Sequence, residues 1–198
     1  MRAMQRDRRR WRIVRRAALG FASALLAGAL GMAGWAGYLQ ATGNVHTVLP
    51  GLLYRSAELG ERGFERVIAR DHIRTVINLR GANPGRPWYE HELAAAKAMG
   101  VRHIDLGMSA SHVPSVRKLA EIRSVLVTAA TPILIHCEGG ADRSGLGAAL
   151  YELWIAHLPP AKAGAQLSFY YGHFPWLGSS TAAMDKAWRE VVRDRPGR

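Results

Sequence analysis

Residues 17–39 form a run of 23 residues without a charged side chain, in a chain of 198 residues. As a helix rising 1.5 Å per residue, this run would be about 34 Å long, which is enough to cross a hydrocarbon core of about 30 Å. Eight arginines and one aspartate precede it in residues 1–16. Because arginine-rich flanks stay in the cytoplasm, the sequence predicts a basic cytoplasmic tail (1–16), a transmembrane signal-anchor helix (17–39) and an exported domain (40–198).

A cleaved signal peptide is the alternative interpretation of the same run. Small residues at Gly31, Ala33 and Ala36 offer cleavage sites. The apolar part of a signal peptide usually has about 7–15 residues, however, and this run is longer. We therefore expect a single-pass protein of the inner membrane, with its folded domain in the periplasm or otherwise outside the cytoplasm.

The net charge of +12 does not indicate a nucleic-acid partner. Residues 1–16 supply +7 of it, and the remaining +5 is spread over 182 residues without a long basic run. No basic patch with interleaved aromatic side chains accompanies this charge. We expect no binding of nucleic acid.

The exported part alternates between strand-like and helix-like segments. Short β-branched or apolar runs predict strands at 73–79, 101–106 and 132–136. Helices are predicted at 88–99, from Ser111 or Ser115 to about residue 129, at 144–157, and around 161–171 and 180–193. This order predicts an α/β domain with a mostly parallel central sheet and helices on both faces, in which ligands bind beyond the carboxyl ends of the strands.

One such strand end carries the only cysteine of the chain. A single cysteine excludes an internal disulfide and a cysteine-rich zinc site. The loop after the strand at 132–136 has a composition suited to phosphate, because glycines allow backbone N–H groups to converge and a helix N-terminus follows. The loop consists of Cys137, Glu138, Gly139, Gly140, Ala141, Asp142, Arg143 and Ser144.

The same loop favours an activated cysteine. Inward N–H groups, the helix dipole and the Arg143 guanidinium all stabilise a thiolate, so Cys137 is the predicted nucleophile. Arg143 can grip two phosphate oxygens with its planar fork. Ser144 is expected to hydrogen-bond the sulfur and ease its departure, and His136 to order the loop.

The segment HCEGGADRSG at 136–145 resembles the HC-x5-R-S/T signature of the protein tyrosine phosphatases and dual-specificity phosphatases. The segments LYRSA (53–57), VINLR (76–80) and PILIHC (132–137) are similar to the bacterial dual-specificity branch, and the resemblance covers roughly residues 48–176. It implies a tyrosine-phosphatase-like fold and hydrolysis of phosphomonoesters through a phosphocysteine. It also implies that neither a metal nor another cofactor takes part.

The general acid departs from the pattern of many relatives, which carry an aspartate on a separate loop upstream of the cysteine. The corresponding residues 107–115 contain no acidic side chain. Some bacterial tyrosine phosphatases and the myotubularin lipid phosphatases place an aspartate directly before the arginine, where it is thought to act as acid. The resemblance therefore favours Asp142, with Asp105 and His112 as the alternatives.

The substrate class stays open at this point. Phosphotyrosine on a protein is what the resemblance implies first, a phosphorylated lipid or inositol headgroup comes second, and a soluble sugar or inositol phosphate third. A pseudophosphatase that only binds phosphorylated partners is the alternative without turnover, and the Arg143-Ser144 pair argues against a sulfur-transfer enzyme. We expect Arg55 and Arg80 to brace the loop, Arg86 to be a solvated surface residue, and His173 and Trp176 to be packing residues.

Overall fold

The computed structural model describes residues 2–176 and 178–195. The chain forms two compact units, one up to Tyr38 and one from Leu39 onward. The boundary between them falls inside the first helix, α1 (Arg2–Thr42).

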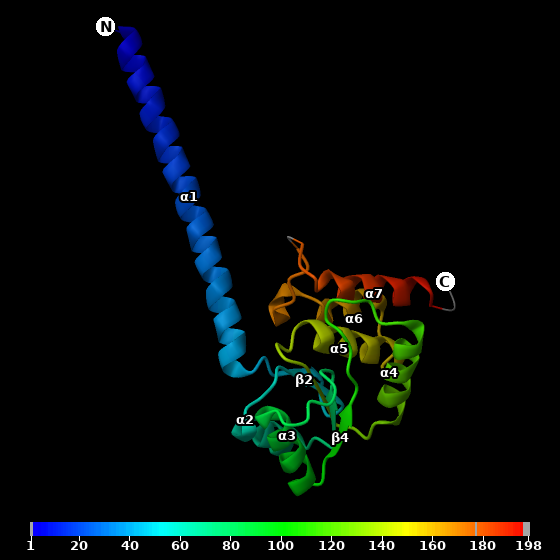
Figure 1. Ribbon diagram of the computed structural model, residues 1–198. Helices are drawn as coiled ribbons and strands as arrows, with labels where there is room; N and C mark the ends of the chain where they lie inside the picture. The colour runs from blue at the N-terminus through cyan, green and yellow to red at the C-terminus, as the bar shows by residue number, and fades with distance from the viewer. Residues whose placement is uncertain (1, 177, 196–198) are drawn as a thin grey trace. The chain divides into compact units, whose positions relative to one another are not determined.

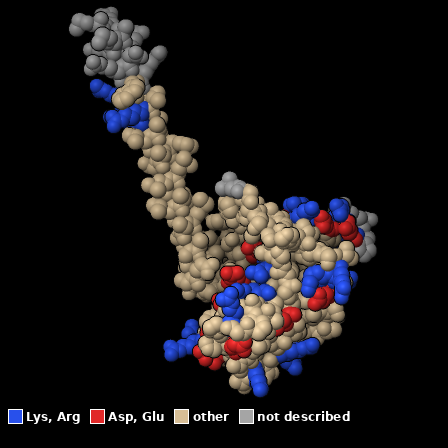
Figure 2. Space-filling model, viewed as in Figure 1, with Lys and Arg blue, Asp and Glu red and all other residues tan. Residues whose placement is uncertain are grey.

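Helix α1 contains the charge-free run. From Val14 to Thr42 it is long and apolar enough to cross a membrane, and an apolar part of 18 residues within it is not buried by protein. Figure 2 shows the helix without charged residues beyond Arg15 and Arg16. A signal sequence near the N-terminus can also meet these criteria of length and composition.

The second unit is built on a five-stranded sheet in the order β1-β2-β5-β3-β4. Its strands β2, β5, β3 and β4 are parallel, and β1 pairs antiparallel with β2. The predicted strands appear as β3, β4 and β5, whereas the β1–β2 hairpin was not predicted. The bounds are β1 (His46–Leu49), β2 (Leu53–Ser56), β3 (Thr75–Asn78), β4 (Arg102–Asp105) and β5 (Ile133–His136).

Helices cover both faces of this sheet, as predicted. On one face α2 and α3 pack on Val76 and Leu134, and on the other α4, α5 and α7 pack on Ile77 and Ile135. Figure 1 shows the two groups on opposite sides of the strands. The bounds are α2 (Glu61–Asp71), α3 (Pro87–Ala98), α4 (Val116–Thr128), α5 (Asp142–Trp154), α6 (Pro160–Ala163) and α7 (Ala182–Arg193).

Two helix ends follow from local chemistry. The Ser115 hydroxyl accepts a hydrogen bond from the Lys118 N–H at 3.2 Å, so Ser115 rather than Ser111 caps α4. Gly100 follows α3 with a φ of 66°, a left-handed conformation that favours glycine and ends the helix there as predicted.

The prediction of one helix over 161–171 is wrong. This segment consists of α6, a 3-10 turn (Gly164–Gln166) and a second 3-10 turn (Phe169–Tyr171). Ser168 between the turns is extended, with φ −137° and ψ 160°. Gly164 lies directly against Trp188, where an added Cβ would come within 2.7 Å of the indole nitrogen. Packing under α7 therefore overrides the helical composition.

Candidate active site

The cysteine loop leaves the carboxyl edge of the sheet at its centre. His136 ends β5 and lies in register with Ser56 of β2 and Asn78 of β3. Cys137 follows as a free thiol, 2% exposed. Helix α5 begins at Asp142, two residues before the predicted start at Ser144, so Asp142 and Arg143 lie in its first turn.

Four consecutive carbonyl groups of the loop are held from outside. The carbonyl of residue 138 accepts from the Glu58 N–H at 3.0 Å, and that of residue 139 from the Asn44 side chain at 2.9 Å. The carbonyls of residues 140 and 141 both accept from Arg55 Nη2 at 2.8 Å. No N–H of residues 138–141 donates to another of the described residues. These donors thus remain for a ligand, which is the arrangement that an anion requires.

Arg55 is the principal brace of the loop. Its side chain is fully buried, and its Nη1 donates to the Gln166 backbone oxygen at 2.7 Å and to the Gln166 side chain at 2.9 Å. The guanidinium lies 4.1 Å from the centre of the Tyr171 ring. Burial lowers the pKa of Arg55 to about 10, so the group stays charged at neutral pH.

Of the two adjacent glycines, only the second has an unusual backbone. Gly140 has a φ of 68°, and a Cβ placed on it would lie 2.5 Å from the Ala57 nitrogen and 2.7 Å from the Ser56 carbonyl carbon. Gly139 is not in the left-handed region, and the nearest atom to its Cβ position is 3.9 Å away, on Gln40. The prediction that both glycines supply special backbone angles is therefore wrong for Gly139.

The residues after the loop differ in what they contact. The Arg143 side chain is 16% exposed, its Nη2 lies 3.8 Å from a Glu138 carboxylate oxygen, and its buried Nε has no hydrogen-bond partner among the described residues. The buried Ser144 hydroxyl donates to the Ser56 carbonyl at 3.4 Å, not to the Cys137 sulfur as predicted. Arg143 is thus the donor that is free to hold an anion.

Asp142 has a partner that the sequence did not reveal. Its Oδ1 lies 2.7 Å from Nδ1 of His173, whose Nε2 lies 2.8 Å from Oδ2 of Asp185 on α7. His173 is 1% exposed. Burial opposes the charged imidazole, but its hydrogen bonds to both carboxylates outweigh burial and raise the pKa of His173. The interpretation of His173 as a packing residue therefore needs correction, because it bridges two acids.

Asp105, the alternative acid, lies elsewhere on the sheet. It ends β4, which is two strand positions from β5, a spacing of about 10 Å. Asn78 donates to its Oδ1 at 2.9 Å and the Tyr89 hydroxyl to its Oδ2 at 2.5 Å. The hydrogen bond to Asp105 raises the pKa of Tyr89 to about 12. Asp105 thus has a structural hydrogen-bonding role at the sheet edge.

A buried carboxylate holds the histidine before the nucleophile. Nε2 of His136 and Nε2 of His103 each lie 2.7 Å from Oε1 of Glu92. Burial raises the pKa of Glu92, but the two imidazoles outweigh it and lower that pKa to about 2. Among the described residues, Glu92, His103 and His136 are also close enough together to be considered as ligands of one metal ion. Two atoms bound to one tetrahedral zinc would lie about 3.3 Å apart, so the 2.7 Å spacing fits direct ion pairs better than shared metal ligation.

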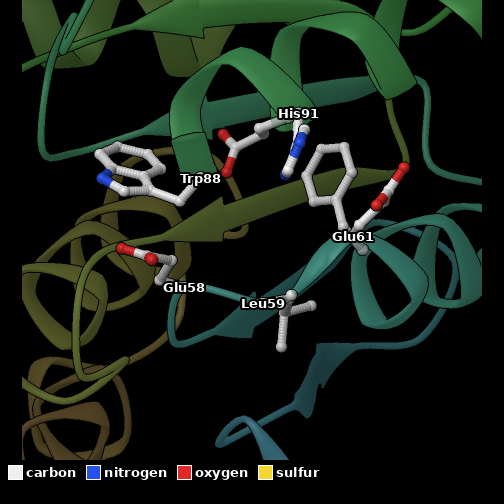
Figure 3. A pocket seen from close by; sticks show the side chains of 8 residues that line it. Glu58, Leu59, Glu61, Trp88 and His91 are labelled. Carbon is white, nitrogen blue, oxygen red and sulfur yellow. The ribbon is translucent and has the colours of Figure 1, made fainter. Parts of the chain in front are cut away.

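A cavity of about 230 Å³ lies between residues 58–64 and helix α3 (Figure 3). Glu58, Glu61, Trp88 and His91 are among its lining residues. Arg80 pairs with Glu58 and lies 4.0 Å from the centre of the Trp88 ring, so it braces this wall, and Arg86 is exposed at the start of α3. Because the walls carry carboxylates, this cavity does not suit a phosphate.

Comparison with known proteins agrees with this fold. A model of the tyrosine phosphatase family matches residues 35–159. TpbA from P. aeruginosa is 23% identical, with a TM-score of 0.57 over 74% of this chain and 84% of that one. Tk-PTP is 21% identical, with a TM-score of 0.58 over 77% and 98%. The PP-IP phosphatase SIW14 from S. cerevisiae is 21% identical, with a TM-score of 0.56 over 76% and 92%. No protein of curated function matches the sequence.

Proposed function

The chain belongs to the tyrosine phosphatase family and is a phosphatase, and from that premise we propose that it hydrolyses phosphotyrosine-type phosphomonoesters through a phosphocysteine on Cys137. The observation that carries this proposal is the set of four loop carbonyls bound from outside. With those carbonyls turned away, the loop N–H groups and Arg143 are available for one phosphate next to the thiol.

The proposed reaction has two steps. The Cys137 thiolate attacks phosphorus, the bond from phosphorus to the leaving oxygen breaks, and Asp142 donates its proton to that oxygen. A water molecule then attacks the phosphocysteine, Asp142 takes a proton from it, and the phosphorus–sulfur bond breaks to release phosphate and the thiolate. The Arg143 fork holds the equatorial oxygens in both steps.

Two similar structures bear on the substrate. One is described as a variant of TpbA in complex with pTyr, and it aligns with 77% of this chain at a TM-score of 0.54. This supports an aryl phosphate at the loop. SIW14 is described as a PP-IP phosphatase, which supports an inositol phosphate headgroup as the second candidate.

The proposal includes a place in the cell. Helix α1 would anchor the enzyme in the inner membrane, with the domain from Leu39 onward outside the cytoplasm. The support is the arginine block before residue 17 and the length of the apolar segment. A leader that is removed after export would give the same domain in soluble form.

Purified full-length protein in detergent tests the chemistry. It should hydrolyse p-nitrophenyl phosphate in excess chelator, and Cys137→Ser should lose turnover while still binding orthovanadate, because the loop and Arg143 remain. Ser124→Ala on the exposed side of α4 is the control and should keep full activity. Undiminished activity of Cys137→Ser would refute the mechanism.

Binding of orthovanadate without turnover in the wild type would instead establish a pseudophosphatase. Parallel assays with phosphotyrosine peptides and phosphoinositides would rank the substrates.

A further inference from the structure

The three side chains Asp142, His173 and Asp185 form a continuous hydrogen-bonded series from the cysteine loop to α7. The two N···O distances are 2.7 and 2.8 Å, and the imidazole between them is 1% exposed. Each ring nitrogen faces a carboxylate oxygen, so both nitrogens carry hydrogens whenever both acids are ionised. A buried, doubly paired histidine of this kind is more than packing.

We propose that His173, fixed by Asp185, is a positioning residue that holds the transferable proton of the general acid Asp142 and orients its carboxyl group. This inference rests on the proposed function, in which Asp142 protonates the leaving group. It extends that function by naming where the proton resides before the reaction.

The proton count of the series explains this role. At rest one proton is shared along the line from His173 Nδ1 to Asp142 Oδ1, while Nε2–H donates to Asp185. When the phosphate ester breaks, this proton passes from Asp142 to the leaving oxygen, and His173 remains as neutral imidazole with its hydrogen on Nε2. Water attack on the phosphocysteine returns one proton to Asp142, which restores the starting state. No additional reactant is needed.

Other charged groups face the series from the neighbouring elements. Arg143 follows Asp142 on α5, and the buried Arg55 of β2 interacts electrostatically with Asp142. Arg189 of α7 lines a cavity of about 390 Å³ together with His173 and Asp185. Asp185 is 26% exposed and gives the series contact with solvent, whereas His173 itself is enclosed. The titrating element of this proposal is the proton shared between Asp142 and His173.

The sign of the pH effect follows from the geometry. Both carboxylates raise the pKa of His173, so the series keeps its proton to a higher pH than free imidazole would. The rate should fall on the basic side when that proton is lost. Removing the Asp185 charge lowers the proton affinity of His173, so the basic limb should move to lower pH.

The test compares pH–rate profiles of full-length variants in detergent, with p-nitrophenyl phosphate and with phenyl phosphate. Asp185→Asn should move the basic limb of kcat/KM down by about one pH unit, because one opposite charge is lost. His173→Gln keeps hydrogen-bonding capacity but cannot store a proton. It should slow the hydrolysis of phenyl phosphate by about 10–100-fold and that of p-nitrophenyl phosphate much less. Asp185→Glu should restore the profile. Asp194→Asn, an exposed aspartate after the same helix, is the matched control.

The outcomes separate this inference from the proposed function. If Asp142→Asn slows phenyl phosphate selectively but Asp185→Asn leaves the profile unchanged, the role of His173 is refuted and the phosphatase mechanism stands. If Asp142→Asn slows both esters equally, Asp142 is not the acid and this inference fails with that assignment. Should the variants not fold, nitrogen NMR of the wild type decides: His173 must titrate above free histidine, and titration at or below that value overturns the proposal.

Discussion

Substituting Gly140 with alanine tests whether the loop is packed as tightly against β2 as the structure indicates. Gly140 has a φ of 68°, and its added Cβ would lie 2.5, 2.7 and 2.9 Å from backbone atoms of Ala57 and Ser56. Backbone atoms of a central strand cannot rotate away as a side chain would. The loop must therefore move outward, against the hydrogen bonds from Arg55 to the carbonyls of residues 140 and 141.

The magnitude has two parts. A left-handed conformation costs a non-glycine residue about 1–2 kcal/mol, and inserting a methyl group into a packed site costs about 1–3 kcal/mol more. The free energy of unfolding should thus fall by roughly 2–5 kcal/mol, which for a domain of this size lowers the melting temperature by on the order of 5–15 °C. A displacement of about 1 Å at the loop should reduce kcat/KM about 100-fold.

Two other glycines give matched controls. Gly85 has a φ of 81° with nothing within 4 Å of its Cβ position, so Gly85→Ala isolates the conformational cost and should leave kcat/KM unchanged. Gly139→Ala adds a methyl group to the same loop at ordinary contact distance. Calorimetry and steady-state assays on all three variants complete the test. Equal activity of Gly140→Ala and Gly139→Ala would refute the packing argument.

Three further predictions concern the acid, the buried carboxylate and the topology. Asp142→Asn should slow the hydrolysis of phenyl phosphate about 10²–10⁴-fold and that of p-nitrophenyl phosphate far less. If Asp105→Asn shows this selective loss instead, the acid is Asp105 on β4. Glu92 has a pKa lowered from 4.5 to about 2, so its contribution to stability is present above pH 4.5 and lost as the pH falls toward 2. The difference in melting temperature between wild type and Glu92→Gln should therefore shrink over that range, while that of the exposed control Glu65→Gln stays constant. A reporter that is active only outside the cytoplasm, fused after Arg198, should be active, and the protein should resist carbonate extraction; a cytoplasmic reporter would contradict the proposed anchor.

The sequence predicted the elements whose composition matches their environment. Strands β3 and β5 are apolar and β-branched because helices cover both of their faces, and such runs are recognisable without a fold. The β1–β2 hairpin was missed because Tyr54, Arg55 and Ser56 are polar, although β2 is fully buried. Arg55 serves the loop, whereas Tyr54 packs in the core, and periodicity cannot reveal a strand of that kind.

The site was predictable only where its residues are adjacent in the sequence. The motif from Cys137 to Ser144 is contiguous, so the nucleophile, the arginine and the loop could be inferred from it. Arg55 lies 85 residues from Gly140, and a resemblance rather than a physical pattern suggested its bracing role. Glu92 belongs to a helix whose composition gave no sign of the two histidines that it contacts.

His173 shows most clearly what the sequence could not supply. It lies 31 residues after Asp142, and 12 residues separate it from Asp185 on the following helix. A lone histidine among aromatic residues is ordinarily a packing residue, and only the fold brings α5 and α7 to its two ring nitrogens. An acid beside a bound phosphate must keep its proton until the ester bond breaks, although the adjacent Arg143 favours the ionised carboxylate. A histidine that shares the proton resolves this conflict, because the proton stays in a hydrogen bond to the carboxyl group and can return to it. An aspartate within the loop can thus serve as the acid that relatives place on a separate loop, provided that a second helix supplies its partner.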